Sequence, residues 1–114
     1  ERVIPLVGAS LWAAQRIVAS TQSEFCFPRY TNSDSCNSNS ASAAINKWVK
    51  TVVSNEAVVH GLRHSFRDRL RQAEAPLEVI DQLGGWSLRT VGQSYGNGHT
   101  LEILNKWVRT IVEM

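Results

Sequence analysis

Two histidines and an arginine lie within five consecutive residues, in the stretch HGLRHSF that begins at His60. His60 and His64 have the i, i+4 spacing that lets two imidazoles bind one metal ion, but no third ligand and no intervening glutamate accompany them. His60 and Arg63 have the i, i+3 spacing of neighbours on one helix face, and together they suit a phosphate group. The remaining interpretation is a basic, solvated helix start. The stretch alone leaves these readings open, with a metal site the weakest.

The segment around this stretch is strongly basic. Residues 63–71, RHSFRDRLR, hold four arginines and one histidine against one aspartate, although the net charge of the whole chain is only +2. Such a small net charge does not by itself indicate a nucleic-acid partner. We interpret Arg67, Arg69 and Arg71 either as a solvated helix face or as contacts to a DNA backbone. His64 is interpreted as a structural residue.

Hydrophobic spacing and turn residues predict a mainly α-helical fold. Residues 2–6, RVIPL, are expected to form a short β-strand. Leu62, Phe66 and Leu70 follow one another at i+4 steps and should form a buried stripe. Pro76 and the Gly84-Gly85 pair should bracket one helix. Expected helices span residues 11–18, 41–53 with Ser40 or Ser42 as N-cap, about 60–73, 76–83, 88–95, and 101–112 with Thr100 as N-cap.

Composition limits the class of protein. At 114 residues the chain is one domain or a piece of one. Residues 21–40 are rich in Ser and Asn and are expected to form a long loop. We prefer reduced thiols over a disulfide for Cys26 and Cys36, since nothing pairs them into a framework. No apolar run is long enough to cross a membrane, and Trp12, Trp48 and Trp107 are expected in the core.

Three motifs in this order resemble the tyrosine recombinases, the family that includes the phage integrases. They are HGLRHSF, the turn LGGWS that contains Trp86, and Tyr95 at nine residues beyond that tryptophan. RVIPL also looks like the strand that follows the family's catalytic lysine. The resemblance covers almost the whole chain and implies the helical C-terminal half of a recombinase catalytic domain, with a short N-terminal β-strand remnant.

The resemblance implies a role for each matching residue. Tyr95 would attack a DNA phosphodiester and form a 3′-phosphotyrosine, for which its phenol, with an ordinary pKa of about 10, needs nearby positive charge. Arg63 would stabilise the charge of the transition state. His60 would hydrogen-bond the phosphate or assist proton transfer, and Trp86 would donate its indole N–H. No metal ion or cofactor would be required.

Two parts of the family's active site are missing from the sequence: an arginine in a T-G-x-R-like motif and a lysine on a β-hairpin. We therefore interpret residues 1–114 as a single, truncated catalytic domain that cleaves DNA poorly alone. Its partner would be double-stranded DNA in the cytoplasm, associated with the nucleoid, and not a membrane. The fragment would dimerise, with segment 99–114 either exchanged between subunits or packed on its own, and the full recombinase would be a tetramer. The alternative is a non-catalytic DNA-binding or dimerisation module.

Overall fold

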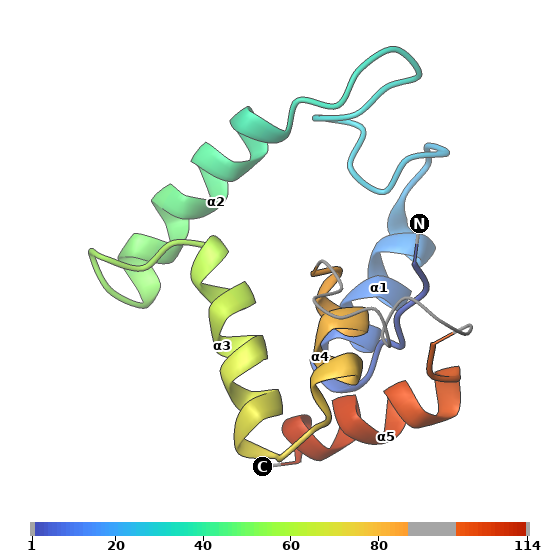
Figure 1. Ribbon diagram of the computed structural model, residues 1–114. Coiled ribbons are helices and arrows are strands. Elements are labelled where there is room, and N and C mark those ends of the chain that lie inside the picture. The colour runs from blue at the N-terminus through green and yellow to red at the C-terminus, as the bar shows by residue number, and fades with distance from the viewer. Residues whose placement is uncertain (1, 87–97, 114) are drawn as a thin grey trace. The chain divides into compact units, whose positions relative to one another are not determined.

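The computed structural model describes residues 2–86 and 98–113, and this part of the chain is mainly helical. It contains α1 (Gly8–Ser20), α2 (Ser38–Val52), α3 (His60–Gln72), α4 (Leu77–Gly84) and α5 (Leu101–Val112) (Figure 1). The predicted mainly α-helical class is confirmed. The helix expected over residues 88–95 lies outside the described residues.

The chain forms two compact units. Glu1–Trp12 and Arg63–Met114 make up the first unit, and Ala13–Leu62 make up the second unit. The boundaries fall inside α1 and α3, so each of these helices contributes to both units. The prediction of a single domain over residues 1–114 stays a prediction.

The expected β-strand over residues 2–6 is wrong, because these residues form neither strand nor helix. A strand requires a neighbouring strand to satisfy its backbone hydrogen bonds. In the described part of the chain the strand-like pairing is limited to an isolated bridge between Thr31 and Cys36. The N-terminal segment instead leads into α1, where Val7 is buried and its N–H donates to Ser10 Oγ at 3.2 Å.

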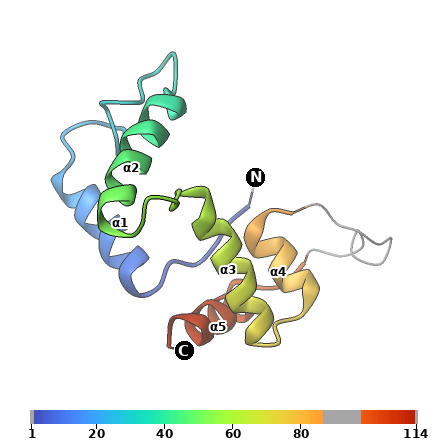
Figure 2. The same cartoon turned by 90° about the vertical axis from the view of Figure 1, so that its left-hand side faces the viewer.

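The core of the first unit is built from α3, α4 and α5. In α3, Leu70 is fully buried and Phe66 packs against the core, but Leu62 is 69% exposed. The predicted stripe is therefore buried only along the part of α3 that belongs to the first unit. Figure 2 shows α5 running past this part of α3, and Arg69 Nη1 donates to the carbonyl of Ile111 at 3.3 Å. The other core residues are Val7, Ala75, Val79, Ile80, Leu83, Leu104, Val108 and Ile111.

Helix α5 packs on its own chain in this structure. Leu104, Val108 and Ile111 occur at i, i+4 and i+7, and all three are buried in the core of the first unit. Trp107 packs partly against that core. Exchange of segment 99–114 between subunits stays a prediction.

The ends of α4 and α5 follow from their capping residues. Helix α4 ends at Gly84, and Gly85 takes the left-handed conformation with φ of 68° that favours glycine at this position. Thr100 caps α5 by accepting a hydrogen bond from the N–H of Ile103 at 3.4 Å. Both ends were predicted. The N-cap of α2 was expected at Ser40 or Ser42, and this expectation is wrong, because Asn37 takes that position.

Helices α1 and α2 bury little apolar surface; α2 and the part of α1 from Ala13 onward belong to the second unit. Neither α1 nor α2 contains a buried residue. Trp12 in α1 is 61% exposed and Trp48 in α2 is 63% exposed, so their expected core positions are wrong. Apart from its isolated bridge, the connection before α2 has no regular secondary structure, but α2 begins at Ser38, inside the segment 21–40 that was expected to be a loop. Asn46 of α2 accepts a hydrogen bond from the N–H of Val59 at 2.7 Å.

Candidate functional site

The centre of the candidate site is the indole ring of Trp86. The guanidinium carbon of Arg63 lies 4.3 Å from the ring centroid, and that of Arg67 lies 4.8 Å from it. Arg63 and Arg67 are i, i+4 neighbours on α3, so both reach the ring from the same helix. A guanidinium over an aromatic face is held by electrostatic attraction to the ring. The structure thus brings two of the predicted site residues, Arg63 and Trp86, into direct contact.

Two glycines place Trp86 where α3 can contact it. Gly85 turns the chain out of α4 in the left-handed conformation, and the N–H of Trp86 donates to the carbonyl of Asp81 at 3.0 Å. The ring then folds back over the helix end, since a Cβ added at Gly84 would overlap the six-membered ring of Trp86. The Gly-Gly-Trp sequence is therefore a steric requirement of this site.

The three arginines predicted to contact DNA have different environments. Arg67 lies on Trp86, and its Nε and Nη2 are buried without a hydrogen-bond partner in the described part of the chain. Arg69 and Arg71 are exposed. Arg69 donates to the C-terminal end of α5, and Arg71 forms a loose ion pair with Asp68 at 3.8 Å. Arg67 thus belongs structurally with Arg63 and Trp86.

His60 is the first residue of α3 and is exposed. It precedes Arg63 by three residues on that helix, and its role beside Arg63 stays a prediction. His64 is also exposed. Tyr95 lies outside the described residues, as does any contact that it makes.

Sequence reasoning missed Asp81. Its side chain is 1% exposed, and among residues 2–86 and 98–113 neither carboxylate oxygen has a hydrogen-bond partner. An acidic residue inside the apolar run of α4, LEVIDQLG, was the available signal. A buried carboxylate without a partner costs free energy, because it loses its hydration and gains nothing in return. Such groups are often found at functional sites.

The structure also bears on metal binding, on the two cysteines and on membrane spans. Within the described ranges no three His, Cys, Asp or Glu side chains gather in a group that could hold a metal ion. Cys26 and Cys36 are both exposed and unbonded. None of the helices in the described part is both long enough and apolar enough to span a bilayer.

Comparison with known proteins gives one family. The model of the Phage integrase family matches residues 1–100, a range that contains HGLRHSF, Trp86 and Tyr95. No curated protein and no solved structure matches the chain.

Proposed function

The chain belongs to the phage integrase family, and on that premise we propose that it cleaves and rejoins DNA strands through a 3′-phosphotyrosine intermediate. The family implies DNA binding and site-specific recombination in general. The observation that supports the finer proposal is the stacking of Arg63 on Trp86 at 4.3 Å. It joins two motifs that are far apart in the sequence, and both motifs supply donors for a phosphate.

Tyr95 is the proposed nucleophile. Its phenolic oxygen attacks the phosphorus and forms the new P–O bond, while the bond to the 5′ oxygen breaks and that oxygen leaves as a hydroxyl. The proton lost by Tyr95 is balanced by the proton taken up by the leaving oxygen, and His60 is the proposed group that assists this transfer. The phosphotyrosine keeps the energy of the broken bond, so attack by a 5′ hydroxyl reverses the step and rejoins a strand.

The remaining residues neutralise charge. Arg63 offers a planar fork of donors to the non-bridging oxygens, which carry more negative charge in the transition state. The indole N–H of Trp86 is the proposed further donor. The N–H groups of Arg67 that are buried and have no hydrogen-bond partner among residues 2–86 and 98–113 support a role for this arginine beside the same phosphate. Arg69 and Arg71 are proposed to contact the DNA backbone. The proposed assembly is a tetramer on double-stranded DNA, in the cytoplasm and associated with the nucleoid.

A suicide DNA substrate tests the nucleophile. Cleavage of such a substrate releases a short fragment, so the covalent protein–DNA adduct accumulates and is counted on a denaturing gel. The adduct should form with the complete gene product that contains these residues and should disappear in Tyr95→Phe. Tyr30→Phe is the matched control, since Tyr30 is the other tyrosine of the chain and stacks under Arg29 at 5.8 Å in the second unit.

The outcomes separate the two candidate functions. Loss of the adduct in Tyr95→Phe, with unchanged DNA affinity and a normal adduct in Tyr30→Phe, supports the recombinase. If the wild-type protein binds DNA and never forms an adduct, the chain is a non-catalytic DNA-binding module. The isolated 114 residues should react slowly in the same assay, because their sequence lacks the family's T-G-x-R-like arginine and hairpin lysine. Loss of one phosphate-stabilising donor costs roughly 10²–10³ in rate.

A further inference from the structure

A third arginine lies against the turn that carries Trp86. A Cβ added at Gly85 would lie 2.4 Å from Arg2 Nη1 and 2.5 Å from Arg2 Cζ, so the guanidinium of Arg2 lies directly against the backbone of Gly85. Gly85 has a φ of +68°, and a side chain at this position would be strained and would also occupy the place of the guanidinium. Arg2 thus contacts the second residue of the Gly-Gly-Trp turn, and Arg63 and Arg67 contact the third.

The segment that carries Arg2 is anchored to the first unit. Val7 is buried in the core, and the hydroxyl of Ser10 donates to the carbonyl of Val7 at 2.7 Å and accepts from its N–H at 3.2 Å. Gly8 approaches α5 so closely that an added Cβ would lie 3.0 Å from Val112 Cγ1. These contacts hold the N-terminal segment on the first unit, although residues 2–6 form neither strand nor helix.

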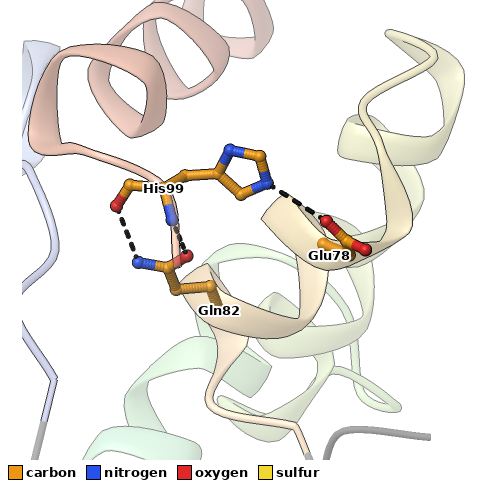
Figure 3. A network of polar contacts seen from close by, with 3 residues as sticks. All are labelled: Glu78, Gln82 and His99. Atoms are coloured by element: carbon orange, nitrogen blue, oxygen red, sulfur yellow. Dashed lines mark hydrogen bonds and ion pairs between the residues drawn. The ribbon is translucent and has the colours of Figure 1, made fainter. Parts of the chain in front are cut away.

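The three guanidinium groups lie around this turn without a carboxylate to balance their charge. None of the three arginines forms an ion pair within the described ranges. Helix α4, which leads into the turn, has two carboxylates. That of Glu78 lies 3.5 Å from His99 Nε2 (Figure 3), and that of Asp81 is buried. Like charges gathered in this way repel one another, so the turn favours an anion, and a phosphate matches the planar fork of a guanidinium.

We propose that Arg2 binds a phosphate of the DNA backbone, next to the phosphate that Arg63 and Trp86 are proposed to hold. Arg2 is exposed, as a contact to a DNA backbone requires, and it lies on the residue that directly precedes Trp86. The proposal rests on the proposed function only in taking DNA as the ligand, and strand cleavage does not enter it. A backbone contact carries no sequence information, so Arg2 should contribute equally on every duplex.

The salt dependence of DNA binding tests the proposal in Arg2→Gln. Fluorescence anisotropy measures how the complete gene product binds a labelled duplex of arbitrary sequence, between about 50 and 200 mM NaCl. Each phosphate contact adds about 0.9 to the slope of log affinity against log salt concentration. The slope should therefore be smaller by about 0.9 in Arg2→Gln, and the affinity at low salt should fall by about 10-fold, because one charge-assisted hydrogen bond is lost.

Two further variants separate a phosphate contact from other effects. Arg2→Lys keeps the charge but lacks the planar group that lies against Gly85. Its slope should stay close to that of the wild type, because lysine also binds phosphate as a point charge. Arg109→Gln is the matched control, since it removes the same charge from an exposed position in the last turn of α5. Its slope should equal that of the wild type.

A second measurement locates the contact at the turn. In the NMR spectrum of the 114-residue chain, the N–H signal of Gly85 should shift when a short duplex is added. This shift should be largely lost in Arg2→Gln and kept in Arg109→Gln. Circular dichroism of Arg2→Gln should match that of the wild type, because the side chain is exposed.

The possible outcomes distinguish this proposal from the proposed function. A wild-type slope in Arg2→Gln contradicts the proposal alone, as does an equal loss in Arg109→Gln. A loss in Arg2→Lys as large as that in Arg2→Gln, or an altered circular dichroism spectrum of Arg2→Gln, would assign Arg2 to the packing of the turn and overturn the proposal. A wild type that binds no duplex contradicts DNA binding itself, and with it the proposed function.

Discussion

The close contact between Gly84 and Trp86 predicts how a methyl group at residue 84 changes the free energy of unfolding. Replacing glycine by alanine in a helix interior stabilises the helix by about 1 kcal/mol, and at Gly84, the last residue of α4, the gain is at most this value. At Gly84 the added methyl group would overlap the Trp86 ring, so the ring must move away from Arg63 and Arg67. The loss of two partly buried cation–π contacts costs about 2 kcal/mol. Gly84→Ala should therefore lower the free energy of unfolding by about 1 kcal/mol, the difference between these two effects.

Gly61→Ala is the control for this experiment. Gly61 also lies in a helix, α3, but a Cβ added there meets nothing within 4 Å. Gly61 is the second residue of α3, so this variant should show only the helix effect, a gain of at most about 1 kcal/mol, and the two variants should differ by about 2 kcal/mol. Urea unfolding followed by circular dichroism measures both. Equal changes in the two variants would refute the packing that we describe, and so would an unshifted Trp86 indole N–H signal in the NMR spectrum of Gly84→Ala.

Two further predictions concern stability. Thr100→Ala removes the N-cap of α5 and should lower the free energy of unfolding by about 1 kcal/mol. Thr100→Ser keeps the capping oxygen and should have nearly the stability of the wild type. Equal effects of the two variants in urea unfolding would argue against the cap. Asp81→Leu removes from α4 a buried carboxylate that has no hydrogen-bond partner in the described part of the chain, and it should raise the midpoint of thermal unfolding by the equivalent of about 1–3 kcal/mol. A lower midpoint would show that the carboxylate has a favourable partner.

Local sequence signals predicted most of the helical fold. The Gly-Gly pair after α4 and Thr100 before α5 determine helix ends through the chemistry of single residues, so they can be read without the rest of the structure. The strand over residues 2–6 could not be predicted in this way. Its pattern is typical of a strand, but a strand exists only when another strand pairs with it. The expectation that Trp12 and Trp48 lie in the core was wrong for a related reason. Apolar spacing indicates one face of a helix, but it does not show whether another element covers that face.

The candidate site was predictable only in part. The spacing of His60 and Arg63 is a property of one helix, and Arg63 is the member of this pair that lies on Trp86 in the structure. The stacking of both Arg63 and Arg67 on Trp86 depends on how α4 packs against α3, which no local pattern contains. Arg67 was accordingly grouped with Arg69 and Arg71 as one set, although its guanidinium has a separate, more buried environment.

The shared ring of Trp86 has a thermodynamic consequence for anion binding. It holds two guanidinium groups of the same charge within about one Debye length of each other, and neither forms an ion pair within the described part of the chain. Their mutual repulsion opposes folding as long as no anion is present. A phosphate that binds to both removes that repulsion, so DNA binding and folding of the first unit should reinforce one another.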